Sequence, residues 1–110
     1  MEETVLFKRK GEGERFERGK VKYIVKFKND KMLAIIAELD EGAETDEYRH
    51  EGEEFRIVIN GEIECTVANK SYKMKAGDSI WHRSDLPHKI KNIGKGKAVY
   101  LTIGIPPTFV

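Results

Sequence analysis

Three histidines and a glutamate have the residue types and spacing for metal chemistry in this chain. His50 and Glu54 lie four positions apart in the stretch YRHEGEEF, and His82 and His88 lie further along in HRSDLPH. Neutral imidazole nitrogens together with an ionised carboxylate suit a divalent transition-metal ion. A lone histidine is more often a structural residue, so these four residues can form a site only if the fold brings them together.

Short β-strands must do this positioning, because apolar and polar residues alternate along most of the chain. The alternating runs are residues 20–27, 32–39, 54–59, 62–67, 72–75, 78–82, 88–92 and 98–103. Turn residues separate the runs, and Asn60-Gly61 between two of them is a strong hairpin signal. Outside these runs there is no sustained helical period. We therefore expect an all-β protein, a sandwich or barrel of six to eight strands.

Alternation also predicts which side chains share a face of a strand. If Glu54 points into the barrel, Arg56 and Val58 point inward with it. A buried guanidinium is costly unless it is paired. Arg56 is therefore expected either to pair with a carboxylate such as Glu54 or Glu64, or to receive an anionic ligand. Trp81 lies on the opposite face from its neighbour His82, which predicts a packing or subunit-interface position.

Composition bounds the class of protein. The chain has 110 residues, of which 39 % are hydrophobic and 35 % charged, with a net charge of +1. This size predicts one domain over residues 1–110. The interleaved charges argue against a nucleic-acid partner. No apolar run is long enough to span a membrane and no segment resembles a signal peptide, so we expect a cytoplasmic protein with no membrane partner.

The usage of individual residue types is also informative. The Lys- and Glu-rich, Gln-free composition is thermophile-like. The single cysteine, Cys65, excludes an intrachain disulfide.

The two histidine-containing stretches resemble the two motifs of the cupins. A histidine, three residues, a glutamate, six residues and a glycine reproduce the core of the first motif within residues 42–61, and residues 77–92 resemble the second motif. The resemblance implies a jelly-roll barrel, or double-stranded β-helix, with residues 1–20 as an extra N-terminal strand region. The C-terminal IPPTF is similar to the end of the cupin sensor domains of helix-turn-helix regulators.

The cupin pattern implies His50, Glu54 and His88 as metal ligands. Iron, manganese, nickel and zinc are all compatible with two imidazoles and one carboxylate. However, Tyr48 stands where the family has the first histidine of its first motif, which removes one of the four usual protein ligands. Two interpretations follow. Either the three remaining residues hold the ion, or metal binding is lost and the histidines form hydrogen bonds with Glu54 and Tyr48.

Four further residues are candidates for lining the cavity: Tyr48, Arg56, His82 and Asn92. Tyr48, His82 or Asn92 could support the metal ligands or act as a weak extra ligand. His82 could instead satisfy a neighbouring turn.

These observations favour a small-molecule-binding cupin, a sensor or carrier whose metal positions a polar or anionic molecule. One alternative is a metal-dependent enzyme of the dioxygenase or isomerase type, with Tyr48 or His82 as general acid or base. A metal-free cupin is the third interpretation. Strands that are apolar on both faces, such as MLAIIAEL, also predict a homodimer, because a second copy or an N-terminal strand would have to cover their outer side.

Overall fold

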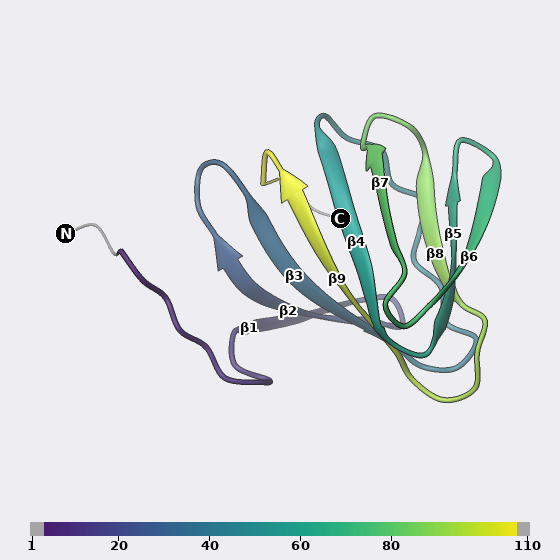
Figure 1. Cartoon of the computed structure of the whole chain (residues 1–110), viewed down its shortest axis with the longest axis horizontal. Helices are drawn as coiled ribbons and strands as arrows, with labels where there is room; N and C mark the ends of the chain where they lie inside the picture. Colours follow the sequence, from purple (N-terminus) through teal and green to yellow (C-terminus); the bar gives the residue numbers. More distant parts are fainter. Residues whose placement is uncertain (1–3, 108–110) are drawn as a thin grey trace.

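The computed structural model describes residues 4–107 of the chain, which form nine β-strands in two sheets (Figure 1). The strands are β1 (Glu14–Arg18), β2 (Val21–Lys28), β3 (Leu33–Leu39), β4 (Glu53–Asn60), β5 (Glu62–Val67), β6 (Lys70–Lys75), β7 (Ser79–Arg83), β8 (His88–Asn92) and β9 (Ala98–Ile105). No helix long and apolar enough to cross a membrane occurs in this described part of the chain.

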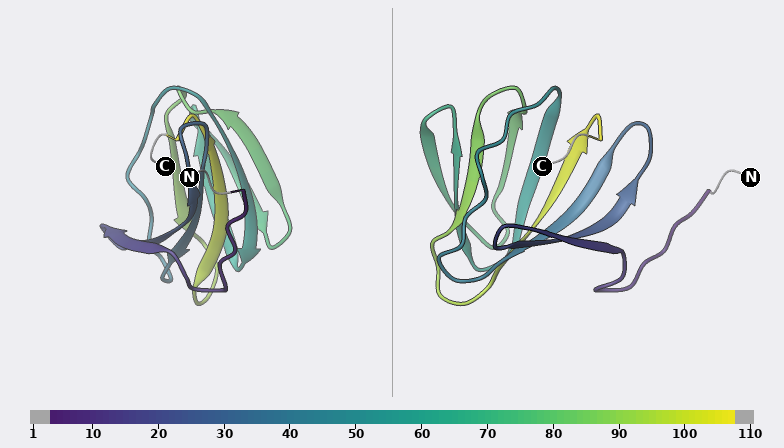
Figure 2. Two further views of the ribbon diagram at one scale, coloured as in Figure 1. Left: turned by 90° about the vertical axis from the view of Figure 1, so that its left-hand side faces the viewer. Right: turned by 180° about the vertical axis from the view of Figure 1, so that it is seen from behind.

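The two sheets have the connections of a jelly roll. The larger sheet has the strand order β1-β2-β3-β9-β4-β7, and the smaller one has the order β6-β5-β8. Every paired neighbour is antiparallel. The chain passes from one sheet to the other between β4 and β5, β6 and β7, β7 and β8, and β8 and β9, so the two sheets form the walls of an open barrel (Figure 2). The predicted all-β jelly roll is confirmed.

The eight alternating runs of the sequence correspond to β2 through β9, and β1 is the additional strand. β1 lies within the region 1–20 and pairs with β2 along its whole length. The sequence ERFER carries one apolar residue, Phe16, and therefore shows little alternation. Phe16 stacks on Tyr23 with 5.0 Å between ring centroids, and this contact anchors the strand to the larger sheet.

The core lies between the two sheets and is apolar over most of its length. In β3 every second residue is buried, as alternation requires, and β5 contributes the buried Cys65. The core changes character where β4, β7 and β8 begin or end. Its buried residues there are polar or charged: Glu54, Arg56, His82, Ser84 and His88. The fold therefore brings buried polar residues of three sequence segments to one place.

Candidate metal centre

Glu54 and its neighbours in β4 have the sidedness that alternation predicts. Glu54, Arg56 and Val58 point inward and are buried, whereas Phe55 is exposed on the outer face. Glu54 stands directly opposite His82 in the β4–β7 pairing. Because directly opposed residues share a face of the sheet, this register places the His82 ring beside the Glu54 carboxylate.

The segment before β4 is held against the barrel by backbone hydrogen bonds. Tyr48 and His88 exchange two of them, at 2.8 and 2.9 Å. The amide of His50 donates to the Ser84 carbonyl at 2.9 Å, and the Ser84 amide donates to the Gly52 carbonyl at 2.7 Å. These bonds fix the position of His50 above the start of β4, although His50 itself lies outside any regular strand.

Gly52 allows the turn between His50 and Glu54. Its φ angle is +111°, a region that residues with a side chain rarely adopt. A Cβ atom at this position would collide with the backbone carbonyl of Ile105 and with the ring of Pro106. A glycine is therefore needed for the chain to pass close to the end of β9 and return His50 over Glu54.

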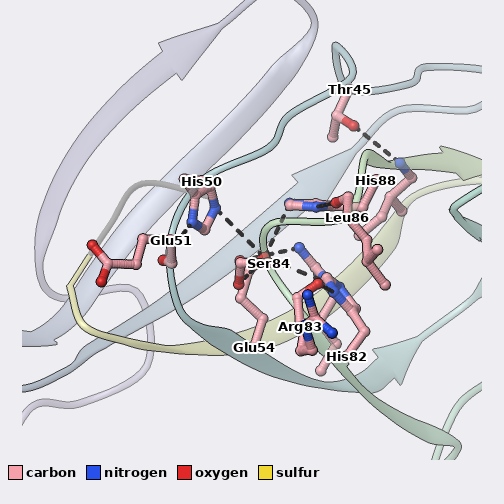
Figure 3. Close-up of polar contacts among 11 residues, drawn as sticks. Thr45, His50, Glu51, Glu54, His82, Arg83, Ser84, Leu86 and His88 are labelled. Carbon is pink, nitrogen blue, oxygen red and sulfur yellow. Dashed lines mark hydrogen bonds and ion pairs between the residues drawn. The ribbon is translucent and has the colours of Figure 1, made fainter.

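Three imidazoles surround one oxygen of the Glu54 carboxylate, as Figure 3 shows. The distances from Glu54 Oε1 are 3.0 Å to His88 Nε2, 3.6 Å to His50 Nε2 and 4.0 Å to His82 Nε2. The Ser84 hydroxyl donates to the same oxygen at 3.2 Å. Glu54, His82 and His88 are buried, and His50 is the partly exposed member of the group. Glu54 is the only buried carboxylate among the described residues.

Backbone carbonyls orient all three rings in the same sense. The Nδ1 atoms of His50, His82 and His88 face the carbonyls of Glu51, Arg83 and Leu86 at 3.3, 2.8 and 2.8 Å. A carbonyl can only accept, so the proton of each neutral ring belongs on Nδ1. The lone pair is then on Nε2, the atom that faces Glu54. Metal-binding histidines are oriented in the same way by a partner on the other ring nitrogen.

The contact between His88 and Glu54 requires a cation or a proton between the two groups. A lone pair and a carboxylate oxygen 3.0 Å apart repel each other unless a positive charge or a hydrogen lies between them. Burial raises the pKa of Glu54, but the hydrogen bond from His88 and the charge of Arg56 outweigh it and lower the pKa to about 2. Glu54 is therefore an ionised carboxylate, and a divalent ion could take the place of the shared proton.

Arg56 is paired inside the barrel, which corresponds to the first of the two roles expected for it. Its Nη2 donates to Glu54 Oε2 at 3.2 Å, and its Nη1 donates to His82 Nε2. Burial lowers the pKa of His82 and the Arg56 charge lowers it further, so the ring is held neutral. Arg56 Nε is buried and has no hydrogen-bond partner among the described residues.

The donor atoms of His50, Glu54 and His88 could hold a metal ion, since they lie within 4.8 Å of one another. The spacing is suitable because two donors each about 2.1 Å from an ion are about 3.0 Å apart at a right angle and about 4.2 Å apart on opposite sides. The distances from Glu54 Oε1 to the Nε2 atoms of His88 and His50 lie within this range. The residues present therefore fit a divalent ion.

Tyr48 and Asn92 lie outside this group. The Tyr48 ring packs against the hydrophobic core, and the Arg18 guanidinium carbon lies 5.7 Å from its centre. The Asn92 amide donates to the carbonyls of Leu39 and Gly96, at 3.0 and 2.8 Å, and so secures the turn before β9. Both residues support the barrel in these positions.

Ser84 belongs to the site and was not predicted from the sequence. It lies in the turn between β7 and β8, where a serine is unremarkable, and only the fold brings it to Glu54.

Solvent reaches the group from two sides. A cleft of about 560 Å³ is lined by Arg49, His50, Gly52 and Asp85, among others. A more apolar groove of about 760 Å³ runs between β6 and β7, with His82, Tyr72 and Trp81 among its lining residues. A small molecule could approach the imidazoles along either route.

The jelly roll and its buried histidine–glutamate group define the class of protein as a metal-compatible β-barrel. The family model described as "Cupin domain" matches residues 35–104, and the chain belongs to this family. Among curated proteins it is 42 % identical over 60 residues to a protein of Archaeoglobus fulgidus, covering 54 % of this chain and 57 % of that protein. It is 30 % identical over 82 residues to the HTH-type transcriptional regulator PuuR of Escherichia coli, covering 73 % of this chain and 44 % of PuuR. The chain thus matches about half the length of these relatives.

Solved structures show the same fold. The structure of KdgF from Halomonas sp. has a TM-score of 0.85 at 15 % identity and matches over 96 % of both chains. A protein of Thermotoga maritima, described as a predicted oxalate decarboxylase, has a TM-score of 0.75 at 26 % identity, covering 84 % of this chain and 90 % of that one.

Proposed function

We propose that this protein is a cupin that binds a divalent metal ion through His50, Glu54 and His88 and uses it to position a small anionic molecule, as a sensor or carrier. The observation that carries the metal is the convergence of oriented Nε2 atoms on Oε1 of one buried carboxylate. The three residues leave coordination positions open for water or a small molecule.

The charge of the site supports an anionic molecule. Glu54 and Arg56 are the buried acid and the buried base of the described residues, and their charges cancel. A divalent ion bound by neutral histidines gives the site positive charge that no other buried side chain balances. Burying net charge is costly, so a bound anion stabilises the loaded site. The buried Nε of Arg56 offers a further donor to such an anion.

The similarity to PuuR supports a sensing role, since that protein is named as a transcriptional regulator. The alternative function is metal-dependent catalysis, and the 26 % identity to a predicted oxalate decarboxylase favours it specifically. When bound, the metal would supply Lewis-acid or redox chemistry. His82, with a lowered pKa and a position beside Glu54, would then be the candidate proton acceptor.

Metal binding is tested with protein stripped by a chelator and titrated calorimetrically with Zn²⁺, Ni²⁺ and Mn²⁺. We expect one ion per chain for the wild type and no measurable binding for His88→Ala. Equal binding by the two proteins would refute the site.

The small molecule is tested by mass spectrometry of whatever co-purifies, followed by titration of the metal-loaded protein with a panel of mono- and dicarboxylates. Turnover or oxygen consumption with a molecule from the panel would establish the enzyme. Binding without turnover supports the sensor or carrier, and the absence of any anion binding would contradict the proposed molecule.

A further inference from the structure

His82 is the third imidazole that faces Glu54, and the proposed metal site has not used it. Its Nε2 lies 4.0 Å from Glu54 Oε1, and its ring centre lies 4.8 Å from that of His88. Two donors on one ion are about 3.0 to 4.2 Å apart, depending on the angle between them. The His82 nitrogen is therefore within the spacing of a ligand that shares an ion with Glu54.

The orientation of the ring agrees with this spacing. His82 Nδ1 donates to the Arg83 carbonyl at 2.8 Å, which leaves the lone pair on Nε2. β7 holds the residue opposite Glu54, so the lone pair is directed into the barrel by the sheet itself. Tyr48, in contrast, lies against the core and beneath Arg18, away from the carboxylate.

The guanidinium of Arg56 donates a hydrogen bond to the lone pair of His82. Its Nη1 donates to His82 Nε2, while its Nη2 donates to the far oxygen of the carboxylate, Glu54 Oε2. The two oxygens thus have separate roles: Oε1 faces the imidazoles and Oε2 faces the guanidinium. If Nη1 turned away, Arg56 would keep its bond to Oε2 and the His82 lone pair would become available.

We propose that His82 is a fourth protein ligand of the metal and replaces the histidine that the family has at position 48. Until the ion binds, Arg56 donates a hydrogen bond to the Nε2 atom of His82. This inference rests on the proposed metal function and sharpens it. Three imidazoles and one carboxylate favour nitrogen-preferring ions such as Zn²⁺, Ni²⁺, Cu²⁺ or Fe²⁺ over Mn²⁺. An anion that attracts Arg56 away from His82 would also strengthen metal binding, because both events break the same hydrogen bond.

The number of imidazole ligands is measured directly with Cu²⁺ as the probe. Electron paramagnetic resonance of the full-length protein carrying one Cu²⁺ resolves coupling to the bound nitrogens. We expect three nitrogens for the wild type, two for His82→Leu and three for Tyr48→Phe, the matched control. Ni²⁺ affinity should fall about 10- to 100-fold in His82→Leu and stay within about 3-fold in Tyr48→Phe.

Two nitrogens in the wild type, or unchanged Ni²⁺ affinity in His82→Leu, would overturn the role of His82 and leave the three-residue site intact. A wild type that binds no metal, or binds it as His88→Ala does, would refute the proposed function itself. The nitrogen count of the wild type decides the question even if His82→Leu does not fold.

Discussion

The inner and outer faces of β4 are reversed in polarity compared with an ordinary barrel strand, which is apolar inside and polar outside. On the inner face Glu54 and Arg56 are 1 % and 2 % exposed, whereas on the outer face Phe55 and Ile59 are 38 % and 52 % exposed. The neighbouring outer-face residue Trp81, directly opposite Phe55 in β7, is 57 % exposed. Around the site, β4 therefore has charged side chains on its inner face and apolar side chains on its outer face.

Each face carries a cost that implies a partner. Buried charges are retained only when they are paired, and the inner face pairs Glu54 with Arg56 and with three imidazoles. Contiguous exposed apolar residues indicate a contact surface. The inner face is thus suited to the proposed ion, and the outer face to the predicted second copy of the chain. Substitutions that affect one face alone can separate the two roles.

The largest effect is expected for Glu54→Gln. The neutral amide cannot replace the charge that holds the ion, so divalent-metal affinity should fall by more than about 100-fold, beyond the loss caused by removing a supporting residue. The metal-free variant should also lose about 3 kcal/mol of unfolding free energy, because Arg56 remains buried without a counter-charge. Calorimetric titration with Zn²⁺ and urea unfolding in chelator measure the two effects.

Glu53→Gln is the matched control, because Glu53 precedes Glu54 in the same strand and is exposed. Its side chain accepts a hydrogen bond from Trp81 Nε1 at 2.8 Å on the outer face. Its metal affinity should equal that of the wild type. Indistinguishable metal affinities for the two variants would show that the inner face has no special role.

Arg56→Met should separate the ion from the small molecule. Without the guanidinium the metal-loaded site loses a positive charge and a donor, so carboxylate affinity should fall at least about 10-fold, equivalent to about 1.4 kcal/mol. Metal content should remain at one ion per chain. Arg15→Met is the control, since Arg15 is exposed on β1, donates to the Gly11 carbonyl and lines neither approach to the imidazoles. Carboxylate binding retained in Arg56→Met would leave Arg56 a purely structural partner of Glu54.

The sidedness of β4 was predictable because it follows from the geometry of any strand. Alternation alone placed Glu54, Arg56 and Val58 on one face, and the motif spacing pointed to His50 and His88 as their companions. These predictions needed only local periodicity or a pattern shared with a family.

The remaining features depend on contacts between distant segments, which periodicity does not encode. The hydrogen bond from Arg56 to His82 depends on the register of β4 and β7. Ser84 lies 30 residues from Glu54 in the sequence and contacts it only because the turn after β7 folds over β4. Asn92 matches a family position, yet its amide donates to the carbonyls of Leu39, at the end of β3, and of Gly96, in the turn before β9. The bounds of β1 could not be predicted from alternation, because its sequence carries a single apolar residue.

Gly52→Ala should affect the inner face without changing any side chain of the site. The new Cβ would collide with the end of β9, so the turn must shift and carry His50 away from Glu54. We expect metal affinity to fall about 10-fold, comparable to the loss of a supporting residue.

Gly77→Ala is the control: its φ angle is also positive, +92°, but no atom lies within 4 Å of the added Cβ. It should lose stability by about 1 kcal/mol from backbone strain alone and keep its metal affinity. Equal metal affinities in the two variants would mean that the turn does not position His50.

The outer face is expected to lie at the contact between two copies of the chain, and the homodimer stays a prediction. Phe55→Lys and Trp81→Lys should weaken dimerisation about 30-fold each, about 2 kcal/mol, as for aromatic residues at the centre of an interface. Sedimentation equilibrium across a concentration series measures this change. Ile93→Lys is the control, because Ile93 is 37 % exposed, close to Phe55, but follows β8 of the smaller sheet. All three variants should bind metal as the wild type does, since the lysines point away from Glu54. A wild type that sediments as a monomer at all concentrations, or an equal effect of Ile93→Lys, would show that the apolar face of β4 and β7 has another purpose.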